Sequence, residues 1–319
     1  MRAQHSAGVS SSVPQFRRVS LWRRIWKNRV MYVMLLLPLA LLIAFKYLPM
    51  YGVQIAFRNY QPSKTISGSE WVGMKYIVKF FQNVKFWTIM KNTLGIGLYG
   101  VAVFPCAIIL AVCLNYLQSA KLRKSVQMVS YLPHFISTVV MCSIILQVFD
   151  AKTGLFNALT GVFGVEARNY MGMESAFPHI YIWSSIWQDV GYASIIYIAA
   201  LSGISPELHE AARIDGATIL QRVWHVDLPG ILPTICVLLI MRCGQVLNVG
   251  YEKVYLLQNA MNLNASEVIN TYVYKQGLTS GLPQYSYATA IGLFVSVVNM
   301  IILLIVNRAS NLVTGNSLW

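Results

Sequence analysis

Two rows of largely polar side chains recur at helical spacing in stretches that are otherwise apolar. The first row is Ser185, Gln188, Asp189 and Tyr192, and the second is Met241, Gln245 and Asn248, with Arg242 beside it. Positions i, i+3, i+4 and i+7 share one face of an α-helix. Hydroxyls and amides on such a face can hold a polar solute through hydrogen bonds. A guanidinium can also bind both oxygens of a carboxylate.

Both rows lie in stretches long enough to cross a bilayer, where polar groups facing lipid are costly. The rows therefore either join helices to one another or line a water-filled path. Asp189 and Arg242 raise the same alternative. At ~1.5 Å per residue both lie about 20 Å from the polar stretch between the two spans. They either pair with each other, or Arg242 faces the path and attracts a carboxylate-bearing solute.

Several kinds of catalysis have no sequence signature here. The chain has no G-x-x-x-x-G-K-[ST] phosphate loop, no HExxH pair and no G-x-S-x-G nucleophile motif. The five cysteines all fall in apolar stretches without metal-ligand spacing. We therefore expect a protein that is not an enzyme, that binds no cofactor or metal itself, and that takes any energy it uses from a partner.

The stretch that separates the two rows is too charged to enter a membrane. It reads SPELHEAARIDGATILQRVWHVDLP from Ser205 to Pro229. Pro206 suits a first helical turn, and Gly216 can end a helix. We expect one short amphipathic helix before Gly216 and a second from Ile219 to Val226, stopped by Leu228 and Pro229.

The spacing within this stretch resembles the EAA loop of binding-protein-dependent ABC importer permeases. The matching positions are Glu210, Ala211, Ala212, Asp215, Gly216, Leu228 and Pro229, with Val226 where isoleucine is usual. In that family the loop lies on the cytoplasmic side and docks into the ATPase subunit. The resemblance implies that residues 203–229 couple this chain to an ATPase.

Composition independently predicts a membrane protein. Hydrophobic residues make up 56% of the 319, and charged residues only 11%, against about 25% in soluble domains. The net charge of +14 does not form an aromatic-interleaved basic patch on a soluble module, so nucleic acid is not an expected partner. Seven basic residues precede the first apolar stretch, which favours a cytoplasmic N-terminus in contact with membrane lipid.

Hydropathy predicts an all-α polytopic protein with six transmembrane helices. The expected spans are residues 30–47, 92–117, 127–149, 178–203, 230–251 and 287–306, each near the roughly 20 residues that cross a bilayer. Six spans place both termini on the cytoplasmic side. The expected division is a basic segment at 1–29, a permease domain at 30–308 and a cytoplasmic tail at 309–319.

Further motifs are similar to those of the carbohydrate-type permeases. They are YLPMYG at 47–52, YLPHFIS at 131–137, IWQDVGY at 186–192, VDLPGILPT at 226–234, INTYVYKQGL at 269–278 and the final Leu318-Trp319. Together they resemble the larger permease subunit of oligo- and polysaccharide importers, the alginate importers among them. The resemblance implies the type I ABC importer permease fold.

The resemblance also implies an assembly in the bacterial inner membrane. A second permease subunit would complete a heterodimer, two ATPase subunits would bind ATP and Mg, and a periplasmic solute-binding protein would deliver the sugar. It assigns both polar rows to the translocation pathway. The alternative is a secondary transporter or channel, which has no use for an ATPase docking loop.

Overall fold

The computed structural model describes residues 26–319, and they form two compact units, 26–53 and 54–319. The first unit is helical throughout. It contains α2 (Arg29–Leu42), a π-helical turn (Ile43–Tyr47) and the start of a 3-10 segment (Leu48–Phe57). All residues from 26 to 51 are exposed, although most are apolar. A helix that is apolar on every side suits a membrane span, as predicted for 30–47.

The second unit is a helical bundle with one small hairpin. Strands β1 (Arg58–Asn59) and β2 (Glu70–Trp71) pair antiparallel. The longer helices are α4 (Phe86–Ala102), α5 (Pro105–Tyr116), α6 (Ala120–Tyr131), α7 (Thr138–Val148), α9 (Phe177–Ser202), α12 (Leu228–Cys243) and α16 (Tyr285–Thr314). The shorter ones are α3 (Lys75–Phe81), α8 (Leu155–Val162), α10 (Pro206–Ile214), α11 (Ile219–Arg222), α13 (Tyr251–Leu257), α14 (Leu263–Ser266) and α15 (Ile269–Tyr274).

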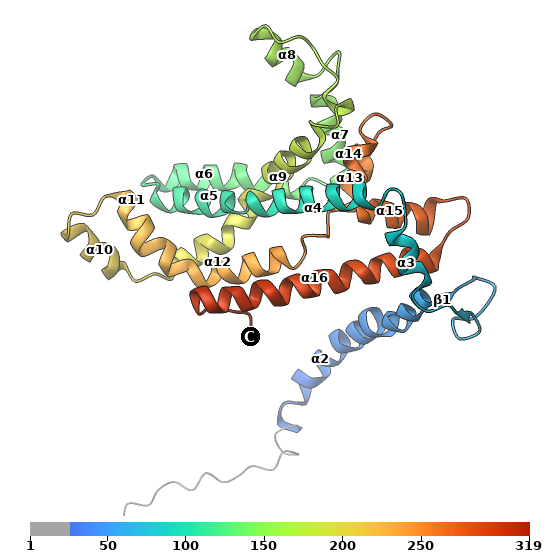
Figure 1. Ribbon diagram of the computed structural model, residues 1–319. Coiled ribbons are helices and arrows are strands. Elements are labelled where there is room, and N and C mark those ends of the chain that lie inside the picture. Colours follow the sequence, from blue (N-terminus) through green and yellow to red (C-terminus); the bar gives the residue numbers. More distant parts are fainter. Residues whose placement is uncertain (1–25) are drawn as a thin grey trace, which may run out of the picture. The chain divides into compact units, whose positions relative to one another are not determined.

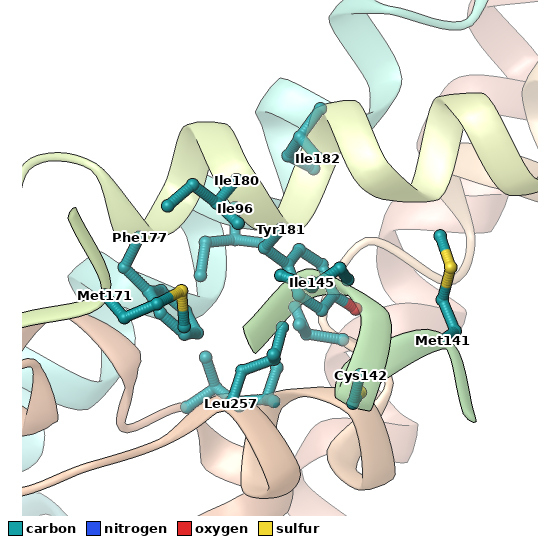
Figure 2. Close-up of a cluster of buried hydrophobic side chains, with 13 residues drawn as sticks. Ile96, Met141, Cys142, Ile145, Met171, Phe177, Ile180, Tyr181, Ile182 and Leu257 are labelled. Carbon is teal, nitrogen blue, oxygen red and sulfur yellow. The ribbon is translucent and has the colours of Figure 1, made fainter. Parts of the chain in front are cut away.

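Short helices close the two ends of this bundle. In Figure 1, α10 and α11 lie at one end, while α13, α14 and α15 lie at the other. Three apolar clusters hold the long helices together. One joins α5, α9 and α12 near α10, a second joins α3, α4, α15 and α16, and a third joins α9 to α7 and α13. Figure 2 shows the third, in which Phe177 and Tyr181 of α9 gather with Leu257 of α13.

The described residues contain four helices that are long and apolar enough to cross a membrane. A bent pair, α6 with α7, would make a fifth. The fourth predicted span, α9, has the length at 26 residues but falls outside this set, because its serines, Gln188 and Asp189 lower its mean hydropathy. The structure is thus an all-α polytopic membrane protein, while the count of six spans stays a prediction.

The predicted third span is wrong as a straight helix. The axes of Ala120–Phe135 and Thr138–Val148 differ by 102°. Pro133 lies at the start of a short 3-10 turn (Leu132–Phe135), and Ile136 is extended. Ser137 then caps α7 by accepting a hydrogen bond from the Val140 N–H at 3.4 Å. Proline and a new N-cap together end one helix and start another.

Two other predicted boundaries need correction. The fifth span ends at Cys243 rather than near residue 251, because the chain turns at Gly244 and the Leu247 N–H donates to Asn299 on α16 at 3.2 Å. The predicted tail is not separate from the bundle. Helix α16 continues to Thr314, and the Leu318 N–H donates to Asn307 at 2.8 Å.

Candidate functional site

A cavity with a largely apolar lining and a few polar side chains lies among α4, α5, α9 and α12. Its volume is about 400 Å³, and a smaller cavity of about 170 Å³ adjoins it towards Gly250. Five residues line both: Ile182, Ser185, Asp189, Arg242 and Gln245. The structure therefore brings side chains from the two predicted rows to one cavity. Such a space can hold a polar solute away from lipid.

Some residues of the two predicted rows line the cavities, and others contact neighbouring segments of the protein. Met241 lines the larger cavity and Asn248 the smaller one, although Asn248 lies beyond the end of α12 rather than on its face. Gln188 instead donates to the carbonyl of Ile136 at 3.0 Å, and Tyr192 stacks on His134 with ring centroids 3.9 Å apart. These last two side chains join α9 to the turn before α7.

Asp189 pairs with a different residue from the one considered in the sequence. Its Oδ1 lies 3.0 Å from Nδ1 of His134, and no ion pair joins it to Arg242 within the described residues. The pairing alternative is therefore corrected. His134 comes from a segment that the bend between α6 and α7 places beside α9, which sequence spacing along α9 and α12 does not show.

Arg242 extends into open space next to a glycine. Its side chain is exposed, and a Cβ built at Gly100 would lie 3.1 Å from its Nη2. No carboxylate within residues 26–319 forms an ion pair with it. The guanidinium is thus free to bind an anion in the cavity.

A buried lysine that no sequence motif singled out adjoins the same cavity. Lys253 on α13 is 7% exposed, and its Nζ donates to Ser185 Oγ at 2.8 Å. Burial lowers the pKa of Lys253 to about 8. It lies outside the predicted rows, and only the packing of α13 against α7 and α9 places it here.

The polar stretch between α9 and α12 folds largely as predicted. Ser205 caps α10 by accepting from the Glu207 N–H at 3.3 Å, with Pro206 in the first turn. Gly216 ends the helix with φ of +76°. Thr218 and Gln221 then form a reciprocal capping box for α11. Local signals therefore suffice for the start and end of α10 and for the start of α11.

The second helix of the loop does not stop at Leu228 and Pro229. Helix is continuous for 25 residues from Ile219 to Cys243. A π-helical turn (Val223–Asp227) precedes the proline, and the Leu228 N–H donates to the carbonyl of Val223. The wider turn accommodates a residue that lacks an N–H and would otherwise clash with the preceding turn.

The loop presents an exposed surface. Glu210, Ala211, Asp215 and Gly216 are exposed, while Ala212 is half-buried. Large apolar side chains beside them are also exposed: Leu208, Ile214, Ile219, Leu220 and Trp224. Exposed apolar side chains gathered around charged ones are typical of a protein interaction surface.

A buried carboxylate holds the loop to the bundle. Asp227 is fully buried, and its Oδ2 accepts a hydrogen bond from Tyr116 at the end of α5 at 2.7 Å. Its Oδ1 lies 3.4 Å from Nε2 of His209 on α10, a distance that pairs charges without a well-formed hydrogen bond. Arg222 lies over the Tyr116 ring at 5.4 Å. These contacts link α10, α12 and α5.

A bundle of apolar helices around a cavity that contains Asp189, Arg242 and Gln245, with an exposed charged loop at one end, is the architecture of a solute permease. The family model described as "Binding-protein-dependent transport system inner membrane component" matches residues 103–313. The chain belongs to this family.

Individual proteins agree with this assignment. The chain is 41% identical over 293 residues, covering 92% of this chain and 91% of the other, to the polygalacturonan/rhamnogalacturonan transport system permease protein YteP of Bacillus subtilis (strain 168). The structure of the present chain is similar to that of a chain in the crystal structure of a bacterial ABC transporter involved in the import of the acidic polysaccharide alginate. That match has a TM-score of 0.84 and 37% identity, and covers 92% of this chain and 99% of the other.

A second crystal structure is similar to the same degree. It is the bacterial alginate ABC transporter in complex with an alginate pentasaccharide-bound periplasmic protein, with a TM-score of 0.84 and 36% identity, covering 93% of this chain and 99% of the other. The chain is therefore a sugar ABC transporter permease of the multi-pass membrane class.

Proposed function

We propose that this permease forms half of the pathway by which an ATP-driven importer takes up acidic oligo- or polysaccharides. A second permease subunit completes the pathway, two ATPase subunits hydrolyse ATP with Mg, and a solute-binding protein delivers the sugar. The complex lies in a bacterial inner membrane with both termini of this chain cytoplasmic. The importers of galacturonan and alginate to which the chain is similar support an acidic substrate.

The observation that carries this proposal is the position of Arg242. Its guanidinium is exposed to the cavity and has no ion pair within the described residues. A charge inside a membrane helix is costly unless it serves a water-filled path or a partner. A planar guanidinium binds a carboxylate through two parallel hydrogen bonds, and each uronate ring of an acidic polysaccharide carries one.

The exposed loop supports the proposal that ATPase subunits bind this chain and drive transport. Its apolar side chains surround Glu210 and Gly216 at the end of the bundle remote from α13. A transporter that works without ATP has no reason to present such a surface. We propose that residues 206–222 dock on an ATPase subunit and that Asp227 transmits the contact to α5.

Transport assays with the assembled complex test the proposal. The chain is reconstituted in proteoliposomes with its second permease, ATPase subunits and solute-binding protein, and tetragalacturonate uptake is measured. Uptake should require ATP in the compartment that the ATPase subunits face. Arg242→Ala should assemble normally yet lose uptake. Uptake that persists without ATP would instead support a secondary transporter, and normal tetragalacturonate uptake by Arg242→Ala would refute the role of Arg242.

A further inference from the structure

Lys253 is a buried cation without an acidic ion-pair partner among the described residues. No Asp or Glu in residues 26–319 forms an ion pair with it. Its ammonium instead donates to Ser185 and lies 5.4 Å from the centre of the Tyr181 ring. Burying an ammonium is costly unless other groups stabilise the charge. A hydroxyl and an aromatic face do so only partly, so the site has capacity for an anion.

Ser185 connects this lysine to the cavity. It lines both the larger and the smaller cavity. Its hydroxyl donates to the carbonyl of Tyr181 at 2.8 Å while it accepts from Lys253. These two contacts fix the Ser185 oxygen at the cavity wall. Arg242 and Gln245 line the same wall from α12 and the turn after it.

The charges around this wall sum to a positive value only because of Lys253. Asp189 is the one acid that lines the cavities, and Arg242 is the one cation that lines them. The Asp189 carboxylate and the Arg242 guanidinium carry opposite unit charges and cancel. Lys253 then supplies the net positive charge. One unit of net charge within a few ångströms of a bound carboxylate changes its binding free energy through Coulomb attraction.

We propose that Arg242, Ser185 and Lys253 form a carboxylate-selective subsite that holds one uronate ring of the transported sugar. Arg242 contacts the carboxylate. Lys253 acts through Ser185 as a positioning residue and makes the local charge positive. The subsite lies where the two cavities meet, at the α13 side of the larger one. This inference rests on the proposed acidic substrate and names the residues that select it.

One substitution that removes the positive charge and one that keeps it test the role of Lys253. In proteoliposomes holding the whole transporter, Lys253→Gln should raise the KM for tetragalacturonate roughly tenfold, because it removes a charge-assisted interaction. Lys253→Arg should restore most of the loss. A role in packing alone predicts the reverse order, since Gln fits the space of lysine and Arg adds atoms. Lys91, exposed on α4, gives a matched control, and Lys91→Gln should change nothing.

A double-mutant cycle tests the charge balance. In an Asp189→Asn background the cavity keeps a positive charge from Arg242, so adding Lys253→Gln should raise KM much less than it does alone. An equal rise in KM in both backgrounds would overturn the subsite. So would a higher KM for Lys253→Arg than for Lys253→Gln.

Two further experiments distinguish failure of the subsite from failure of the proposed acidic substrate. If Lys253→Gln does not assemble, Arg242→Gln tests the same subsite from an exposed position, and an unchanged KM for tetragalacturonate would overturn it. A wild-type transporter that takes up maltotetraose but not tetragalacturonate would refute the proposed acidic substrate and the subsite together. That result needs no variant, so it is distinguishable from failure of the subsite alone.

Discussion

The hydroxyl of Tyr116 donates a 2.7 Å hydrogen bond to the fully buried carboxylate of Asp227. Tyr116 ends α5, which lines the cavity further along, and Asp227 lies in the π-helical turn of the exposed loop. This single contact therefore joins the loop to a helix of the cavity wall.

Tyr116→Phe should destabilise the loop without changing its exposed surface. A buried charged acceptor left without its donor costs about 1–3 kcal/mol or more. We expect a lower Tm of the purified complex and more ATP hydrolysed per sugar transported. Tyr47→Phe, at an exposed tyrosine remote from this contact in sequence, serves as control. An unchanged Tm and unchanged stoichiometry in Tyr116→Phe would contradict this role of Asp227.

Gly216→Val should impair coupling through backbone strain. The residue has φ of +76°, and no atom lies within 4 Å of an added Cβ. The effect is therefore conformational, about 1–2 kcal/mol for a residue with a Cβ in this region, and larger for a β-branched one. We expect normal membrane insertion but reduced sugar-stimulated ATP hydrolysis. Gly216→Asn, which tolerates this conformation, should retain most activity, and full activity of the Val variant would refute the prediction.

Gly97→Ala should destabilise the bundle while Gly95→Ala, two residues away on α4, should not. A Cβ at Gly97 would lie 2.1 Å from the Val246 carbonyl oxygen, whereas nothing lies within 4 Å of one at Gly95. Overpacking of this kind costs roughly 1–3 kcal/mol. Thermal unfolding of the detergent-solubilised complex measures both, and equal Tm values would show that the turn after α12 moves freely.

Reporter fusions can establish which side of the membrane each loop faces. Fusions at Lys64, Gly164 and Leu263 should report the external side, and fusions at Lys121, Thr218 and Asn316 the cytoplasm. The prediction follows from six spans and the basic N-terminal residues. An external signal at Thr218 would invalidate both the orientation and the docking proposal.

Uptake of an acidic sugar should fall as pH rises through about 8. Burial lowers the pKa of Lys253 to about 8, so its charge is present below that pH and lost above it. The groups that face it are Tyr181 and Asp189 on α9 and Cys142 on α7. Arginine stays charged throughout this range. The ratio of wild-type to Lys253→Arg uptake should therefore decline between pH 7 and 9, and a constant ratio would assign any pH effect elsewhere.

Local signals determined what the sequence predicted correctly. The caps of α10, its end at Gly216 and the apolar lengths of the long helices depend on neighbouring residues alone. Two of the errors came from contacts between distant segments. Asn299 ends α12 by binding the Leu247 N–H, and α13 packing buries Lys253.

The polar row on α9 shows the same limit. Helical spacing correctly placed its four residues on one helix. It did not show that the four side chains divide between the cavity and the segment before α7. Ser185 and Asp189 face the cavity, whereas Gln188 and Tyr192 contact the segment before α7. Only the 102° bend between α6 and α7 brings His134 to Asp189, and no periodicity within α9 indicates it.

The continuous helix from Ile219 to Cys243 connects the exposed loop directly to the cavity. Its 25 residues span about 37 Å at ~1.5 Å per residue, with exposed Ile219 and Leu220 at one end and Arg242 beside the other. A tilt of about 5° at the loop displaces the far end by roughly 3 Å over that length, the length of one hydrogen bond. If a partner docks at Ile219 and Arg242 binds a carboxylate, as proposed, movement at the first site would reach the second through this one helix.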